Sequence, residues 1–189
     1  MSIRLRLTLL YSLILALTLV AFSVILYVTQ ARTTLNDTKE GLARRADYLI
    51  EGPLNHQSWD KAFKPDPSKL GTFTQICNFD GQVLGRSPNL GDTLVLPLGQ
   101  EGLQAARRGE TRVEIAEIET ERLLIHNQPF HYGADETPLI LQIAASLAEQ
   151  DQNLDTLGRI LIIGSSLAVI AAFGIGWLLA GLTLRPINR

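Results

Sequence analysis

The chain has 189 residues, of which 46% are hydrophobic, and its formal net charge is −2. Its one cysteine, Cys77, excludes an internal disulfide, and we expect it to be a small buried hydrophobe. This near-neutral balance gives no electrostatic reason to expect nucleic acid as a partner. The charges are unevenly placed, because none occurs over 7–31 or over 160–184.

These two uncharged stretches have the length of membrane-spanning helices. A helix over 7–28 would be about 33 Å long, at roughly 1.5 Å per residue, which matches the roughly 30 Å hydrocarbon core of a bilayer. The stretch 160–184 predicts a second span. A cleaved signal peptide is the alternative for the first stretch, although the apolar region of a signal peptide usually runs only about 7–15 residues.

Basic residues flank the two spans at the chain ends, without acidic neighbours. Under the positive-inside rule, 1–6 and 185–189 lie in the cytoplasm and 29–159 lies outside. The outer segment has 13 basic and 19 acidic side chains, which gives it a net charge of −6. The flanking residues are Arg4, Arg6, Arg185 and Arg189.

The outer segment, 29–159, has the size of one domain and begins with a helix. The spacings alternate between three and four along a series that predicts a helix, so we expect the first span to continue as a helix to about Ile50. The series is Leu35, Thr38, Leu42, Arg45 and Leu49. Glycine and proline then predict a loop over 52–69, with a short helix around 56–63.

Alternating apolar residues predict five strands in the rest of the domain. The Asp80-Gly81 pair predicts a two-residue type I′ turn between the first two strands. A short helix over 98–108, closed by Gly109, separates them from the other three. The last strand should place Leu139, Leu141, Ile143 and Ala145 on one face. The fold class is therefore an α+β membrane protein with a roughly five-stranded antiparallel sheet between long N- and C-terminal helices. The strands are expected over 72–79, 82–86, 112–115, 121–132 and 138–146.

The last helix follows the final strand without a proline and continues into the second span. Its leucines recur at spacings of three and four, and small residues recur every fourth position within the span. Small side chains let helices approach closely in lipid, so we expect a helix interface, either with the first span or with a second copy. The predicted interface residues are Leu147, Leu154, Leu157, Leu161, Gly164, Ala168 and Gly176.

The C-terminal stretches resemble a known receptor family. Residues 141–154 and 177–187 look like the input half of bacterial sensor histidine kinases of two-component systems. In that family the Leu-Arg-Pro-Ile stretch after the second span begins a HAMP signal-relay linker, and Pro186 matches its proline. The hairpin 79–87 and the order of elements resemble the family's PAS-like extracytoplasmic sensor fold.

The resemblance implies a homodimeric receptor in the bacterial inner membrane that binds a small ligand or a periplasmic protein. A response regulator, ATP and Mg²⁺ would be engaged only by domains missing from this chain, so we expect a fragment or a receptor whose output lies elsewhere. On this topology His56, His126 and His131 are extracytoplasmic and cannot be the phospho-accepting histidine. The alternatives are a chemoreceptor or cyclase input module, and a stand-alone membrane adaptor for a periplasmic partner.

No catalytic constellation is visible in the sequence. There is no glycine-rich phosphate loop, no Gly-x-Ser-x-Gly and no Cys-x-x-Cys. His126 and His131 are five apart, so a strand puts them on opposite faces and a shared metal is not expected. We expect no cofactor in these residues, and a solvated hairpin face for Glu114, Glu117, Glu119 and Glu121. Polar and aromatic candidates for ligand contact are Trp59, Arg86, Arg122, His126 and Tyr132.

Overall fold

A computed structural model describes residues 3–55, 59–63, 72–91, 94–118 and 121–183. The helices are α1 (Ile3–Leu49), the π-helical turn η1 (Ile50–Leu54), α2 (Trp59–Ala62), the 3₁₀ turn η2 (Pro88–Leu90), α3 (Gln100–Arg107) and α4 (Ala148–Thr183). The strands are β1 (Thr72–Cys77), β2 (Val83–Arg86), β3 (Arg112–Ile118), β4 (Glu121–Tyr132) and β5 (Thr137–Ser146). The chain divides into two units, 34–150 and the paired segments 1–33 and 151–189.

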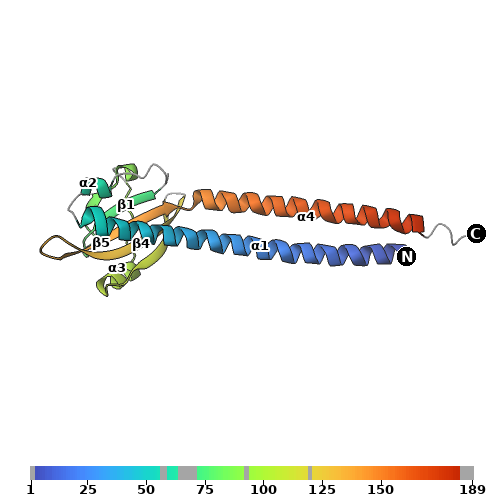
Figure 1. Cartoon of the computed structure of the whole chain (residues 1–189), viewed down its shortest axis with the longest axis horizontal. Coiled ribbons are helices and arrows are strands. Elements are labelled where there is room, and N and C mark those ends of the chain that lie inside the picture. Colours follow the sequence, from blue (N-terminus) through green and yellow to red (C-terminus); the bar gives the residue numbers. More distant parts are fainter. Residues whose placement is uncertain (1–2, 56–58, 64–71, 92–93, 119–120, 184–189) are drawn as a thin grey trace, which may run out of the picture. The chain divides into compact units, whose positions relative to one another are not determined.

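The first of these units, 34–150, is built on a five-stranded sheet with the order β2-β1-β5-β4-β3 (Figure 1). Every neighbouring pair is antiparallel, so the α+β class and the antiparallel sheet predicted from the sequence are confirmed. The last strand, β5, lies in the centre, where it pairs with β1 and β4.

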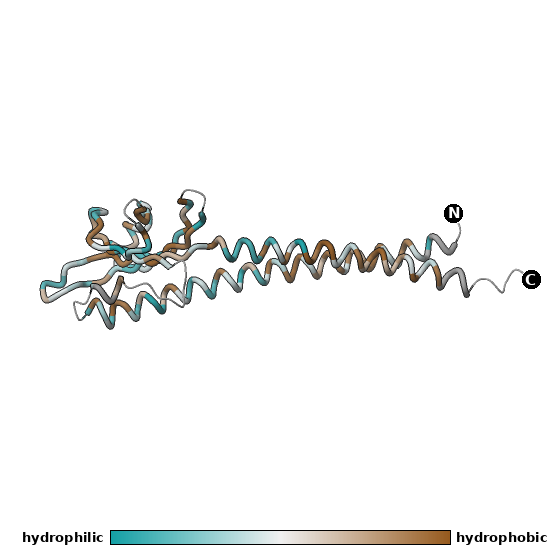
Figure 2. Tube along the Cα trace, turned by 90° about the horizontal axis from the view of Figure 1, so that it is seen from above, coloured by the Kyte–Doolittle hydropathy of each residue, from teal (hydrophilic) through white to brown (hydrophobic). Residues whose placement is uncertain are grey.

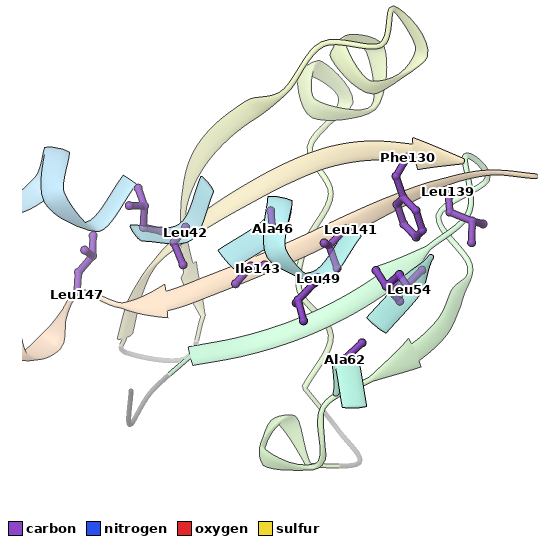
Figure 3. Packing of buried hydrophobic residues seen from close by; sticks show 12 residues of the cluster. Leu42, Ala46, Leu49, Leu54, Ala62, Phe130, Leu139, Leu141, Ile143 and Leu147 are labelled. Atoms are coloured by element: carbon purple, nitrogen blue, oxygen red, sulfur yellow. The ribbon is translucent and has the colours of Figure 1, made fainter. Parts of the chain in front are cut away.

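One face of the sheet is covered by the C-terminal part of α1. Leu42, Ala46 and Leu49 recur at helical spacing, are buried, and pack against the β5 residues Leu141 and Ile143 (Figure 3). The predicted face of β5 is therefore confirmed, and it forms the main hydrophobic core of the unit. The core continues into η1 and α2 through Leu54 and Ala62.

The opposite face of the sheet is covered by α3 and by the segment 94–99. Ile140 and Ala144 of β5 are completely buried there. A strand that is covered on both faces reads as a continuous apolar run, which is how Leu139–Ile143 reads apart from one glutamine.

The local predictions have mixed outcomes. The short helix closed by Gly109 is confirmed, with Gly109 at φ +76°. The type I′ turn is wrong, because Gly81 has a positive φ and Asp80 does not. The β1–β2 connection is instead a three-residue loop, in which Gly81 N–H donates to Asn78 O and Asn78 N–H donates to Gln82 O, both at 3.0 Å. The Asn78 side chain favours this longer loop, because its Oδ1 accepts from the Asp80 and Gln82 amides.

The predicted loop over 52–69 also begins later than expected. Residues Ile50–Leu54 form a π-helical turn that includes Pro53, so helical structure continues past the expected end of α1. A proline lacks the N–H that a regular helix would use, and the wider turn accommodates it. The short helix is four residues long, Trp59–Ala62, and most of the remaining loop lies outside the described residues.

The second unit consists of the first part of α1 and most of α4, which lie side by side. Ser23 Oγ and Ser165 Oγ are 3.3 Å apart and share a hydrogen bond. A Cβ placed on Gly176 would lie 3.2 Å from Thr8 Cγ2. Both helices are long and apolar enough to cross a membrane, with mean hydropathies of 2.6 and 2.2 over their most apolar windows, and Figure 2 shows brown hydrophobic residues along both.

The covered face of α4 follows the predicted interface only in part. Leu154, Leu157 and Leu161 are half-buried, as is Gly176. Gly164 and Ala168, however, are exposed. An α-helix has 3.6 residues per turn, so a strict seven-residue repeat drifts around its surface and leaves the covered face. Pro186 and the rest of the expected HAMP stretch lie outside the described residues, and Leu147 belongs to the sheet unit.

Candidate functional site

Two of the residues predicted to contact a ligand, Trp59 and Tyr132, are in contact with each other. Trp59 of α2 and Tyr132 of β4 meet edge to face, with ring centroids 5.2 Å apart. By strand alternation, Arg122 and His126 lie on the same face of the sheet as Tyr132, at other positions along β4. Arg86 pairs with Gln75 and lies on the opposite face. No shared site therefore follows from these five residues.

The aromatic pair belongs to a cluster that seals the end of the main core. The ring of Phe63 lies 5.8 Å from that of Trp59, and both pack on the β2 backbone at Gly85. A Cβ on Gly85 would lie 2.5 Å from a ring carbon of Phe63, so any other residue here requires the aromatic ring to move. The cluster accounts for Trp59 and Tyr132 as packing residues.

A row of buried amide side chains crosses the middle of the sheet on the α3 side. The amide row consists of Gln75, Gln142 and Asn127, which are opposite one another on β1, β5 and β4 and are each at most 1% exposed. Residues that pair directly in an antiparallel sheet point to the same face. The row is therefore a product of strand register, and it is the main polar feature of the described interior.

The amide row is joined by hydrogen bonds that run in one direction. Gln75 Nε2 donates to Gln142 Oε1 at 2.8 Å, and Gln142 Nε2 donates to Asn127 Oδ1 at 2.9 Å. The segment above the sheet is tied to the row, because Gln75 exchanges hydrogen bonds with both backbone groups of Leu96. The row thus holds three strands and the covering segment in one arrangement.

The row ends at Asn127 Nδ2, which is buried without a hydrogen-bond partner among the described residues. Directly above it lies Gly102 of α3, where a Cβ would be 3.1 Å from Asn127 Nδ2 and 2.8 Å from Glu114 Oε1. Glu114 was expected on a solvated face, but its side chain is only 20% exposed. Its carboxylate accepts from the Gly99 amide at the start of α3, at 3.4 Å. This end of the row is therefore closed by α3.

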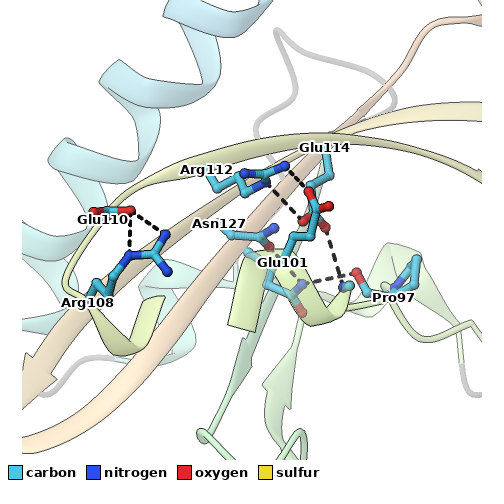
Figure 4. Close-up of polar contacts among 9 residues, drawn as sticks. Pro97, Glu101, Arg108, Glu110, Arg112, Glu114 and Asn127 are labelled. Carbon is cyan, nitrogen blue, oxygen red and sulfur yellow. Dashed lines mark hydrogen bonds and ion pairs between the residues drawn. The ribbon is translucent and has the colours of Figure 1, made fainter. Parts of the chain in front are cut away.

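An ion pair joins α3 to the sheet at this point, among other polar contacts (Figure 4). Arg112 of β3 pairs with Glu101 in the first turn of α3 and, at 3.5 Å, with Glu114. Arg108 at the other end of α3 pairs with Glu110, at 2.7 Å. These pairs are largely exposed, so each contributes little to stability, and only the Arg112–Glu101 pair joins α3 to the sheet.

The amide row offers hydrogen bonds between strands and has no titrating group of its own. Amides do not titrate near neutral pH, and burial raises the pKa of the neighbouring Cys77 thiol to about 11. A thiol with a raised pKa is a poor nucleophile. Among the described residues no group of three or more His, Cys, Asp or Glu side chains is placed to hold a metal ion.

A second polar network lies on the α1 side of the sheet. We call it the imidazole bridge; it consists of His126, Gln128 and Asp47. His126 Nε2 lies 3.1 Å from Gln128 Oε1, and Gln128 Nε2 donates to Asp47 Oδ1 of α1 at 3.0 Å. The predicted separation of His126 from His131 is confirmed, because His126 is buried and His131 is exposed. The bridge links buried His126 of β4 to exposed Asp47 of α1.

The junction between β5 and α4 is anchored on both sides. Leu147, the one residue between them, is buried, and its N–H donates to Arg122 O of β4 at 2.8 Å. The first amide of α4, at Ala148, donates to Ser146 Oγ at 3.2 Å. Gln150 in the first turn of α4 donates to Thr38 of α1. The junction is thus bonded to the sheet and to α1.

Sequence reasoning missed both networks. The available signal was the glutamine at Gln142, in an otherwise apolar strand run. A polar residue in a strand that is buried on both faces needs a partner, but the partner is set by the register between strands far apart in the sequence. Comparison with protein-family models and with characterised proteins finds no match to this sequence.

Proposed function

We propose that this chain is the input half of a transmembrane signal receptor of the sensor histidine kinase type, with a PAS-like extracytoplasmic domain. The observation that carries the proposal is the junction at Leu147, where the central strand of the sheet passes into a helix long and apolar enough to cross a membrane. A change in the sheet would reach such a helix through one buried, hydrogen-bonded residue.

The two apolar helices frame the sheet unit in the chain, which is the layout that a receptor needs. In the proposed topology α1 and α4 cross the bacterial inner membrane and the sheet unit lies outside. Their exposed apolar side chains, such as Ile163, Leu167 and Ile170 at 66–68% exposure, would then contact lipid. The exposed small residues Gly164 and Ala168 provide a surface for α4 of a second copy in a homodimer.

A stimulus would act by binding one arrangement of the domain better than another, because only a difference in affinity moves an equilibrium. The stimulus would be a small ligand or a periplasmic protein that changes how β5 and α1 are held. The shift would pass through α4 to a HAMP linker beginning at 185–189. ATP, Mg²⁺ and a response regulator would be engaged by cytoplasmic domains following this chain.

The proposal is tested by breaking the junction. The chain is fused after Arg189 to the cytoplasmic part of a sensor histidine kinase, and four glycines are inserted between Leu147 and Ala148. The matched control carries the same insertion between Asp135 and Glu136, in the exposed β4–β5 hairpin. The junction insertion should change autophosphorylation in membranes, and the hairpin insertion should leave it unchanged. Equal levels in both insertions and in the parent fusion would contradict signal transfer through the junction.

The coding sequence beyond position 189 separates the kinase from its alternatives. A dimerising helix with a histidine followed by an acid, then an ATP-binding domain, supports the kinase. Long heptad repeats would indicate a chemoreceptor, and a stop codon would indicate an adaptor that holds a periplasmic partner.

A further inference from the structure

The imidazole bridge fixes which nitrogen of His126 carries a proton. Gln128 Nε2 donates to the Asp47 carboxylate, so Gln128 Oε1 is the atom that faces His126. An amide oxygen is an acceptor, and therefore His126 Nε2 must be the donor. In neutral His126 the proton is then on Nε2, and Nδ1 has a bare lone pair.

The other nitrogen, Nδ1, is buried without a partner among the described residues. A bare lone pair in an apolar interior is tolerable, but a second proton on His126 would turn Nδ1 into a donor that has no acceptor. It would also place a positive charge on a side chain that is only 3% exposed. Burial of this kind lowers the pKa of His126 from its ordinary 6.5, against smaller opposing effects of Gln128 and Asp47.

The surroundings of His126 offer little to hold that charge. Its cross-strand neighbours on the same face are apolar, Val113 of β3 and Ile143 of β5. From α1 the facing carboxylate is Asp47, whose bond to the bridge goes through Gln128 rather than to the ring. Other charged side chains of these elements lie farther from His126. Arg122 is four residues away on β4, where it is opposite Glu117 of β3. Arg45 of α1 lies over the Tyr48 ring, 5.6 Å from its centroid.

We propose that protonation of His126 releases the C-terminal part of α1 from the sheet, so that acid is an input to this domain. The charged imidazole is accommodated by moving out of the interface with α1, and the contacts of Leu42, Ala46 and Leu49 with the sheet weaken. The link to signalling rests on the proposed function, whereas the acid response of α1 is a property of the domain in any setting.

The direction of the effect follows from linkage. The released state takes up a proton near pH 6.5, and the packed state does so at lower pH, so packing is favoured above pH 6.5. As the pH falls below that value, the equilibrium for release rises by at most about tenfold per pH unit, and it levels off below the pKa of the packed state.

The test is amide hydrogen exchange of residues 42–49 in the full chain in detergent micelles, between pH 7.5 and pH 4.5, after correction for the intrinsic pH dependence of exchange. The variant His126→Gln removes the titrating group, and His131→Gln, on the exposed side of the same strand, is the matched control. Protection should fall below pH 6.5 in the parent and in His131→Gln, and stay level in His126→Gln.

A second variant keeps the inference testable if His126→Gln fails to fold. Asp47→Asn leaves an acceptor for Gln128 but removes the nearby negative charge from an exposed position. The fall in protection should still begin near pH 6.5 but continue to lower pH and become larger, because Asp47 favours the charged imidazole in the packed state. Level protection in the parent, or an unchanged fall in both His126→Gln and Asp47→Asn, would overturn the proposal. None of these outcomes depends on kinase output, which separates them from the test of the junction.

Discussion

The amide row makes a quantitative prediction for the substitution Gln142→Met. Methionine matches glutamine in length, so the change removes hydrogen bonds with little change in packed volume. In the parent, Gln142 accepts from Gln75 Nε2 at 2.8 Å and donates to Asn127 Oδ1 at 2.9 Å. After the substitution Gln75 Nε2 keeps its bond to Leu96 O, but Asn127 Oδ1 loses its donor in a site that is 1% exposed.

These losses set the expected magnitude. An unsatisfied buried polar group costs about 1–3 kcal/mol, and the Gln75–Gln142 bond itself contributes about 1 kcal/mol. We therefore expect Gln142→Met to lower the free energy of unfolding by about 2–4 kcal/mol. With a urea dependence of about 2 kcal/mol per molar, the unfolding midpoint should fall by about 1–2 M. Gln75→Met should be less than additive with it, by about 1 kcal/mol, because both remove the same bond.

The assay is urea unfolding of the full chain in mild detergent, followed by tryptophan fluorescence. All variants are made in a Trp177→Phe background, in which Trp59 is the one tryptophan that fluoresces. Trp59 packs edge to face on Tyr132, so its emission reports on the folded sheet unit. Gln104→Met, on the exposed face of α3, is the matched control and should change stability by no more than about 0.5 kcal/mol. A midpoint for Gln142→Met within 0.3 M of the parent, a threshold of about 0.6 kcal/mol, would refute a dry, hydrogen-bonded row.

Three further predictions follow from single contacts. Gly85→Val should destabilise the sheet unit by more than about 2 kcal/mol in the same assay, because the new Cβ would lie 2.5 Å from a ring carbon of Phe63. Unchanged stability would show that α2 does not pack on β2 at this position. Cys77 should resist a maleimide at pH 8 until urea is added, because with a pKa of about 11 only about one thiol in a thousand is ionised. Fast reaction of the folded chain would contradict the burial of Cys77. The hydroxyl oxygens of Ser23 and Ser165 are 3.3 Å apart, so Ser23→Cys and Ser165→Cys together should form an intramolecular disulfide under mild oxidation. A yield no higher than in chains that carry only one of these two substitutions would contradict the helix pairing.

The elements of the sheet could be predicted from the sequence because each carries its own periodicity. Alternation alone places Leu141 and Ile143 on one face of β5, and Gly109 marks the end of α3. The β1–β2 turn shows the limit of such reasoning. Asp-Gly is compatible with both a two-residue and a three-residue connection, and hydrogen bonds donated by the Asp80 and Gln82 amides to the Asn78 side chain accompany the longer one.

The polar networks could not be predicted, because they depend on contacts that local patterns do not encode. Gln75 and Gln142 are 67 residues apart, and a shift of one residue in the β1–β5 register would point them to opposite faces. The link between Gln128 and Asp47 spans 81 residues and depends on where α1 lies along the sheet. The predicted ligand residues were chosen by chemical type, which identifies polar side chains but not which of them meet.

In the proposed topology the chain crosses the membrane at α1 and α4, and the sheet unit lies outside. The most direct test of this topology is labelling of a cysteine at Asp135, in the exposed β4–β5 hairpin, with a membrane-impermeant maleimide in intact bacteria. Buried Cys77 should give little background, and a cysteine at Ser2 is the control for the opposite side. We expect Asp135→Cys to be labelled in intact cells and Ser2→Cys only after lysis. Labelling of Asp135→Cys only after lysis would contradict this topology.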